Sequence, residues 1–191
     1  MTGGYFSDAA LFLIDTVIGL YTLIILLRFL FQLTRADFYN PVSQFIVKVS
    51  NPPLAYLRRI VPSVRGIDFA AVVLLVVLES LRLGLKELMM GHTPHLAGVL
   101  MLGIAEILKL AVYVFVFSIF ARALLSWVSK GHHHPLAHLL GSFTEPLLAP
   151  ARRRLPATGG LDLSPIIVFI VLMLVLKLLV QPLLDLGRVM I

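Results

Sequence analysis

The chain has 191 residues, of which 59% are hydrophobic and only 14% are charged; its net charge is +6 and its mean hydropathy is +0.98. A soluble domain carries about 25% charged residues, so this composition excludes a soluble monomer, and its apolar richness excludes a disordered chain. Cysteine is absent, which excludes disulfides and thiolate chemistry. An integral membrane protein remains, in which the basic excess is expected to set topology rather than to bind nucleic acid.

Four stretches predict membrane-spanning helices, because a helix needs about 20 mostly apolar residues to cross a bilayer. In chain order they cover residues 9–33, 69–85, 103–127 and 165–186. The second stretch is short and is interrupted by Glu79 and Arg82. The predicted fold is therefore all-α, a polytopic membrane protein with four transmembrane helices.

The two long connections between these spans are predicted to contain amphipathic helices. Each has apolar residues at the i, i+3, i+4, i+7 spacing of one helix side. These residues are Val42, Phe45, Ile46 and Val49, and then Leu136, Leu139, Leu140 and Phe143. Pro52 and Pro146 interrupt the patterns. We therefore expect two short helices in each of the segments 41–61 and 135–155, lying in the membrane interface with their apolar side toward the acyl chains.

Basic residues are concentrated in the same two connections. The first holds five and the second four, whereas the opposite side offers only Lys86 and Arg188 near the span ends. Because cytoplasmic loops carry the excess of Lys and Arg, both long connections are predicted to be cytoplasmic and both termini extracytoplasmic.

The chain matches itself without gaps at an offset of 94 residues. Residues 28–68 and 122–162 share 11 identities in 41 positions, which predicts two tandem units, 1–95 and 96–191, in parallel orientation within one membrane domain. The motif positions are Arg28, Pro41, Pro52, Arg58, Arg59, Pro62, Gly66 and Asp68, then Arg122, Pro135, Glu145, Pro146, Arg152, Arg153, Pro156, Gly160 and Asp162. Each unit is predicted to contain a membrane span, then an amphipathic segment, then a second span.

Charged residues also fall inside the predicted spans, in the half away from the cytoplasm. They are Asp15, Glu79, Arg82, Glu106, Lys109 and Lys177. Such residues are costly in lipid and usually pair with one another, so we expect a network between helices, with Asp15 beside Lys109 or Lys177. The network is either purely structural or part of an ion-conducting or ion-sensing path.

The sequence contains no recognisable catalytic or cofactor-binding motif, so an enzyme is not expected and no cofactor is predicted. His132, His134 and His138 are weak candidates for metal ligands, with His134 and His138 at i, i+4 spacing. No acidic residue lies in the same short stretch, and a solvated loop is the default interpretation.

The stretch SFTEPLLAP at residues 142–150, followed by RRRLP and GGLDLSPIIVF, resembles the signature of the YggT family. The first unit carries a similar stretch, SNPPLAYLRRIVPSVRGIDFAAVVL, so the resemblance covers nearly the whole chain. It implies a bacterial inner-membrane protein. Members are associated with osmotic-stress tolerance and ion homeostasis, others with cell division, and plastid relatives with assembly of a membrane cytochrome.

Two functions therefore stay open. The first is support of ion homeostasis or osmotic-stress tolerance. The alternative is a membrane scaffold or assembly factor that recruits partners through its cytoplasmic amphipathic helices. Anionic lipid headgroups are the expected partners of the arginines that end these helices. A homo-oligomer and other membrane-protein partners are further options.

Overall fold

A computed structural model describes residues 3–64, 66–128, 135–154 and 162–191, and this part of the chain is helical. The elements are α1 (Gly3–Thr34), α2 (Pro41–Leu57), α3 (Phe69–Met89), α4 (Leu96–Val128), α5 (Pro135–Arg154), α6 (Ser164–Val175), η1 (Leu176–Val180) and α7 (Gln181–Met190). The last three form one rod, in which η1 is a π-helical turn. Among the described residues, the only β pairing is an isolated bridge between Val64 and Ile67.

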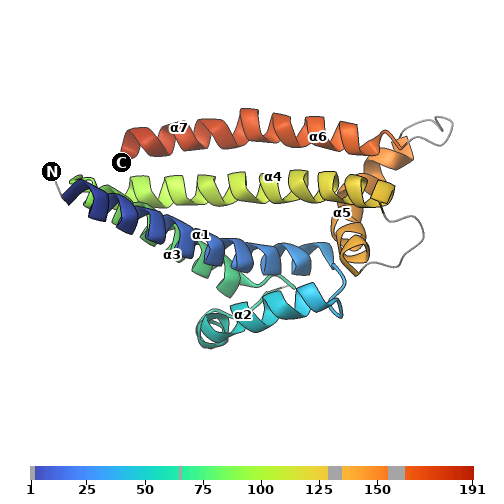
Figure 1. Ribbon diagram of the computed structural model, residues 1–191, viewed down its shortest axis with the longest axis horizontal. Coiled ribbons are helices and arrows are strands. Elements are labelled where there is room, and N and C mark those ends of the chain that lie inside the picture. Colours follow the sequence, from blue (N-terminus) through green and yellow to red (C-terminus); the bar gives the residue numbers. More distant parts are fainter. Residues whose placement is uncertain (1–2, 65, 129–134, 155–161) are drawn as a thin grey trace.

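The long helices lie side by side as a bundle (Figure 1). Helix α4 packs on both α3 and the α6–η1–α7 rod, and α1 packs on α3. Both chain ends lie at one end of the bundle, and α2 and α5 lie toward the other (Figure 1). The fold thus separates the two termini from the two long connections.

Three of the described helical stretches are long and apolar enough to cross a membrane: Gly4–Thr34, Leu96–Ser126 and Ser164–Met190. They correspond to the first, third and fourth predicted spans. Helix α3 has the length of a span but carries Glu79, Arg82, Lys86 and Glu87, and it is not among these three stretches because it holds too many charged residues. The chain is an all-helical, multi-pass membrane protein.

Helices α2 and α5 are each continuous, so the expected break at Pro52 and Pro146 is wrong. Both helices instead change direction along their length (Figure 1). A proline removes one backbone hydrogen bond and bends a helix, but packing on a neighbour can hold the helix together. In α2 the carbonyl of Val49, which Pro53 cannot pair with, accepts a hydrogen bond from the Tyr21 hydroxyl of α1 at 3.4 Å.

The apolar sides of α2 and α5 pack largely against the bundle rather than toward acyl chains. Ile46, Leu139 and Phe143 are buried in the protein, although Val42 and Phe45 are exposed. The Phe143 ring lies between Phe115 of α4, stacked at 4.8 Å, and Phe31 of α1, edge-on at 5.1 Å. Helix α5 therefore ties the first and third long helices together.

Candidate functional site

Acidic and basic side chains of α1 and α3 meet inside the bundle. Arg82 Nη1 lies 2.9 Å from Asp15 Oδ1, and Lys86 Nζ lies 3.5 Å from the other oxygen of this carboxylate. Arg82 also pairs with Glu79, one turn earlier on α3. Glu79 is only 3% exposed, so Arg82 compensates a buried carboxylate and a half-buried one at once.

A cavity of about 180 Å³, lined by charged as well as apolar side chains, adjoins this cluster between α1, α3 and α4. Its walls come from Gly19, Thr22, Glu79, Arg82, Glu106, Lys109, Leu110 and Tyr113. Glu106 and Lys109, at i, i+3 on α4, form a 2.5 Å ion pair. The Thr22 hydroxyl oxygen is buried and bonds to no described residue. A buried hydroxyl without a partner is costly, so the cavity suits water or a small ion.

The expectation that Asp15 pairs with Lys109 or Lys177 is wrong, because Arg82 and Lys86 are its partners. Lys109 is paired with Glu106 on its own helix. Lys177 lies on the exposed side of η1 and forms no ion pair with a described residue. Which basic residue meets Asp15 depends on the rotation of each helix about its axis, and sequence spacing within one helix does not fix that rotation.

Two arginines near the ends of α1 and α4 reach back to the helix that follows. Arg28 Nη1 donates to the Val47 carbonyl at 3.2 Å and to Ser50 Oγ at 2.8 Å. Arg122 Nη1 makes the matching contacts 94 residues later, with the Gly141 carbonyl at 3.3 Å and Thr144 Oγ1 at 2.8 Å. In each half, the arginine therefore bonds to the helix that follows its own long helix.

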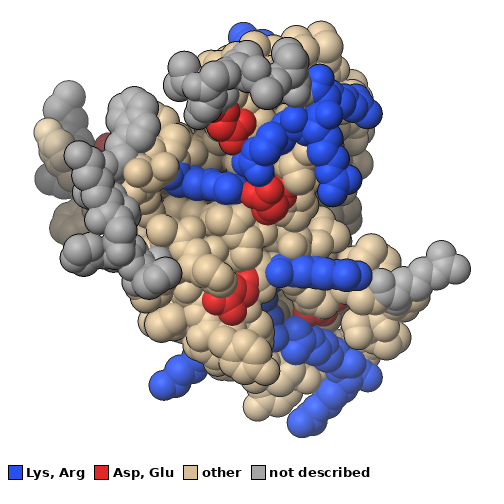
Figure 2. All heavy atoms as spheres, turned by 90° about the vertical axis from the view of Figure 1, so that its right-hand side faces the viewer, with Lys and Arg blue, Asp and Glu red and all other residues tan. Residues whose placement is uncertain are grey.

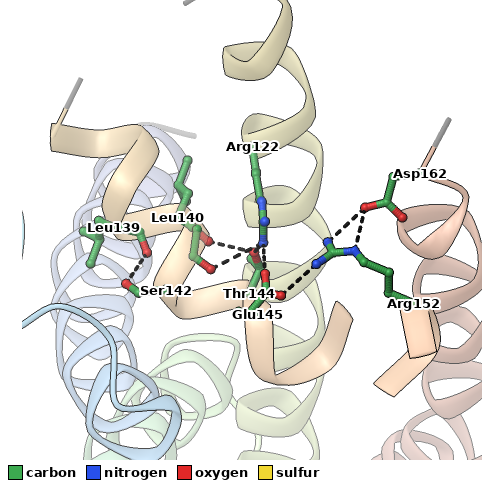
Figure 3. Close-up of polar contacts among 9 residues, drawn as sticks. Arg122, Leu139, Leu140, Ser142, Thr144, Glu145, Arg152 and Asp162 are labelled. Atoms are coloured by element: carbon green, nitrogen blue, oxygen red, sulfur yellow. Dashed lines mark hydrogen bonds and ion pairs between the residues drawn. The ribbon is translucent and has the colours of Figure 1, made fainter. Parts of the chain in front are cut away.

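A second arginine in each half holds the aspartate before the next long helix. Arg58 donates through Nε and Nη2 to Asp68, and Nε lies 3.2 Å from the carboxylate. Figure 3 shows the same arrangement in the second half, where Arg152 reaches Asp162 at 2.9 Å. Arg–carboxylate pairs of this kind fix orientation as well as adding energy. They therefore position the start of α3 and of α6 relative to α2 and α5.

Glu145 joins the two arginines of the second half. One carboxylate oxygen lies 3.0 Å from Arg122 and the other 2.8 Å from Arg152 (Figure 3). Partial desolvation, the largest single effect, would raise the pKa of Glu145, but the hydrogen bonds and charges of both arginines outweigh it and lower the pKa. The pKa of Asp162 is likewise lowered, because hydrogen bonds from Ser164 and Arg152 exceed the desolvation effect.

The other motif positions serve local structure where the structure describes them. Pro41 begins α2 and Pro135 begins α5. Gly66 has φ +83°, a conformation that favours glycine, and its carbonyl accepts from Gln32 at 3.0 Å. The Arg59 guanidinium lies 5.5 Å from the Tyr56 ring centre. The positions Pro156 and Gly160 lie outside the described residues.

The connection after α1 contacts the beginning of α5, a feature that sequence reasoning missed. The Asp37 backbone N–H donates to Ser142 Oγ at 3.1 Å, and its carboxylate lies 3.1 Å from His138 Nδ1. Asn40 Nδ2 donates to the Pro135 carbonyl at 2.7 Å. These contacts join residues about 100 positions apart, and no local sequence pattern predicts them.

Of the three histidines proposed as weak metal ligands, the structure describes only His138. Within the described residues, no group of three or more His, Cys, Asp or Glu side chains is placed to hold a metal. His132 and His134 lie outside the described residues. His138 is a partner of Asp37 instead.

The end of the bundle that carries α2 and α5 is rich in Lys and Arg side chains (Figure 2). Acidic side chains are interspersed on this face, where they adjoin basic ones (Figure 2). Arg152 pairs with the exposed carboxylate of Asp162, whereas Arg58 pairs with the buried carboxylate of Asp68. Basic side chains thus concentrate at the end of the bundle away from the two chain ends (Figures 1 and 2).

A helical, multi-pass membrane protein with internally paired charges is the class that these features define. The CCB3/YggT family model matches residues 7–89 and again residues 101–183. The chain belongs to the CCB3/YggT family. It is 39% identical over 163 residues to the uncharacterized protein YggT of Escherichia coli strain K12, covering 84% of each chain.

Other relatives show the same extent of similarity. An uncharacterized protein of Pseudomonas aeruginosa is 43% identical over 171 residues, covering 88% of this chain and 87% of the relative. The protein in the proC 3' region of Vibrio alginolyticus, also uncharacterized, is 44% identical over 161 residues, covering 83% and 86%. No solved structure matches the chain.

Proposed function

We propose that the protein is built from two tandem copies of one span–helix–span unit, with α3 as a fourth membrane span. The support is the equivalence of contacts 94 residues apart, in which Arg28 and Arg122 make the same two hydrogen bonds. The family model also matches the chain twice. The charges of α3 are tolerable in a span because Glu79 and Arg82 pair within the bundle.

In this topology, both termini are extracytoplasmic and α2 and α5 lie on the cytoplasmic side of an inner membrane. A reporter fused after Ile191 that fluoresces only in the cytoplasm should be dark. The same reporter inserted after Arg154, at the end of α5, should be bright and serves as the control. A bright fusion at Ile191 would overturn the proposed orientation.

The protein's role, in this proposal, is to support ion homeostasis or osmotic-stress tolerance by admitting small ions to the cavity between α1, α3 and α4. The observation that carries it is the cavity of about 180 Å³ lined by Glu79, Arg82, Glu106 and Lys109. Ionisable side chains inside a membrane span that face the bundle interior or a water-filled cavity mark ion pathways. The unpartnered Thr22 hydroxyl in the same wall gives an entering ion or its water a ligand.

Ion flux into liposomes that contain the purified chain tests this role, with K⁺, Na⁺ and Cl⁻ assayed separately. We expect flux from the wild type and at least a tenfold loss in the Glu106→Gln variant, which removes a charge from the cavity wall. The matched control is Asp185→Asn, because Asp185 pairs with Arg188 at i, i+3 but is exposed on α7. Absence of wild-type flux for all three ions would overturn the proposal.

A scaffold role is the second candidate, and the exposed aromatic side chains around α2 favour it. Tyr39, Phe45 and Tyr56 are 88%, 61% and 67% exposed. Aromatic residues at this density suit a membrane interface or a partner surface. Proximity labelling from a tag in the connection after α5 should give a reproducible set of membrane partners, which Phe45→Ser should reduce. An unchanged set of labelled partners in Phe45→Ser would argue against a role for this surface in binding partners.

A further inference from the structure

A cavity of about 220 Å³ lies between the end of α1 and the first half of α2, apart from the charged cavity described above. Its lining is Arg28, Phe31, Gln32, Arg35, Ala36, Phe38, Ser43, Ile46 and Val47. Two arginines and a glutamine thus face an otherwise mostly apolar space, and the lining contains no acidic residue. Such a combination recognises a group that is both anionic and attached to an apolar body.

The first arginine, Arg28, lacks the carboxylate that its counterpart has. Arg122 pairs with Glu145 at 3.0 Å (Figure 3). The residue 94 positions before Glu145 is Asn51, which is exposed and has no charge. No described carboxylate lies within ion-pair distance of Arg28, whose only described acceptors are the Val47 carbonyl and Ser50 Oγ. A half-buried guanidinium with spare donors is therefore left facing the cavity.

The second arginine, Arg35, occupies a strained backbone position. It follows the last residue of α1 with φ 54°, in the left-handed region where glycine is usual. The Ala36 N–H closes the helix end by donating to the Phe31 carbonyl at 2.9 Å. A non-glycine residue there is strained, because its Cβ crowds the following carbonyl oxygen. The Arg35 side chain is exposed and bonds to no described residue, so nothing within the described chain offsets this strain.

We propose that this cavity binds the phosphate of a membrane phospholipid, with Arg28 and Arg35 as the phosphate ligands. Guanidinium groups bind phosphate oxygens through paired, charge-assisted hydrogen bonds. Phe31, Ala36 and Phe38 form an apolar wall beside the two arginines. Because Phe38 is 55% exposed, the glycerol and acyl chains of a bound lipid can extend from the cavity along this wall into the bilayer. The site lies at the end of the bundle that carries α2 and α5. In the proposed topology this end is cytoplasmic, so phospholipid headgroups of the inner leaflet would contact it.

The test is native mass spectrometry of the full chain, delipidated in neutral detergent and titrated with phosphatidylglycerol. Arg35→Gln and Asn51→Glu should each weaken binding about tenfold or more, since one charge-assisted contact is lost. Asn51→Glu supplies Arg28 with the carboxylate that Arg122 already has, so the variant should keep the wild-type melting temperature. The matched control is Arg154→Gln, which removes an exposed charge from α5 outside the cavity and should leave affinity unchanged.

Two further probes distinguish the source of the phosphate. Diacylglycerol, which has the acyl chains but no phosphate, should bind at least tenfold more weakly than phosphatidylglycerol. Inorganic phosphate at millimolar concentration should not displace the lipid. Equal binding of diacylglycerol, full displacement by inorganic phosphate, or equal loss of affinity in Arg154→Gln would each overturn the proposal. Unchanged affinity in both Arg35→Gln and Asn51→Glu would overturn it as well.

Discussion

Replacing Arg82 with Leu is expected to lower the free energy of unfolding by about 3–5 kcal/mol. Arg82 pairs with Glu79 on its own helix and with Asp15 of α1. The substitution leaves Glu79, which is 3% exposed, without its partner, and a buried, uncompensated charge costs more than the ion pair contributed. The measurement is unfolding in mixed micelles with an increasing fraction of denaturing detergent.

Two variants separate this explanation from a general loss of packing. Arg188→Leu removes an exposed arginine that also has an acid at i−3, so it should change the unfolding free energy by less than about 1 kcal/mol. The double variant Glu79→Leu/Arg82→Leu removes both charges and should recover much of the loss. If the double variant is no more stable than Arg82→Leu, the uncompensated charge of Glu79 is not the cause of the destabilisation.

The helices could be predicted from sequence because hydropathy and turn residues act locally. The predicted spans 9–33 and 103–127 lie within α1 and α4, and the proline-led starts of α2 and α5 are where the pattern placed them. The failure at Pro52 has a physical reason, since tertiary contacts such as Tyr21 with Val49 hold α2 together where local propensity predicts a break.

The side-chain partners were harder to predict than the helices. Arg28 bonds to the helix that follows its own long helix, because the short connection leaves few other groups within reach. The partner of Asp15 depends on how α1 and α3 rotate against each other, which the sequence leaves free. The contact between Asp37 and His138 depends on how the two halves dock, and no spacing rule covers that.

The close packing of α4 against α7 could not be predicted from the sequence either. It depends on two glycines. A Cβ atom added at Gly187 would lie 2.9 Å from both the backbone nitrogen and the Cα of Leu102. A Cβ added at Gly98 would lie 2.5 Å from the backbone carbonyl carbon of Met190. Membrane helices pack closely through small residues, because lipid provides no hydrophobic driving force between them. The absence of side chains at these two positions therefore sets the distance between α4 and α7.

Gly187→Ile is accordingly expected to destabilise the protein by about 3 kcal/mol, since the new side chain meets backbone atoms that cannot move aside without separating two helices. The matched control is Gly84→Ile in α3, where an added Cβ has no atom within 4 Å. That control should be neutral or slightly stabilising, because isoleucine is a better helix former than glycine. The same detergent unfolding measurement compares the two variants, and a Gly187→Ile protein as stable as Gly84→Ile would show that α4 and α7 are not in close contact in the membrane.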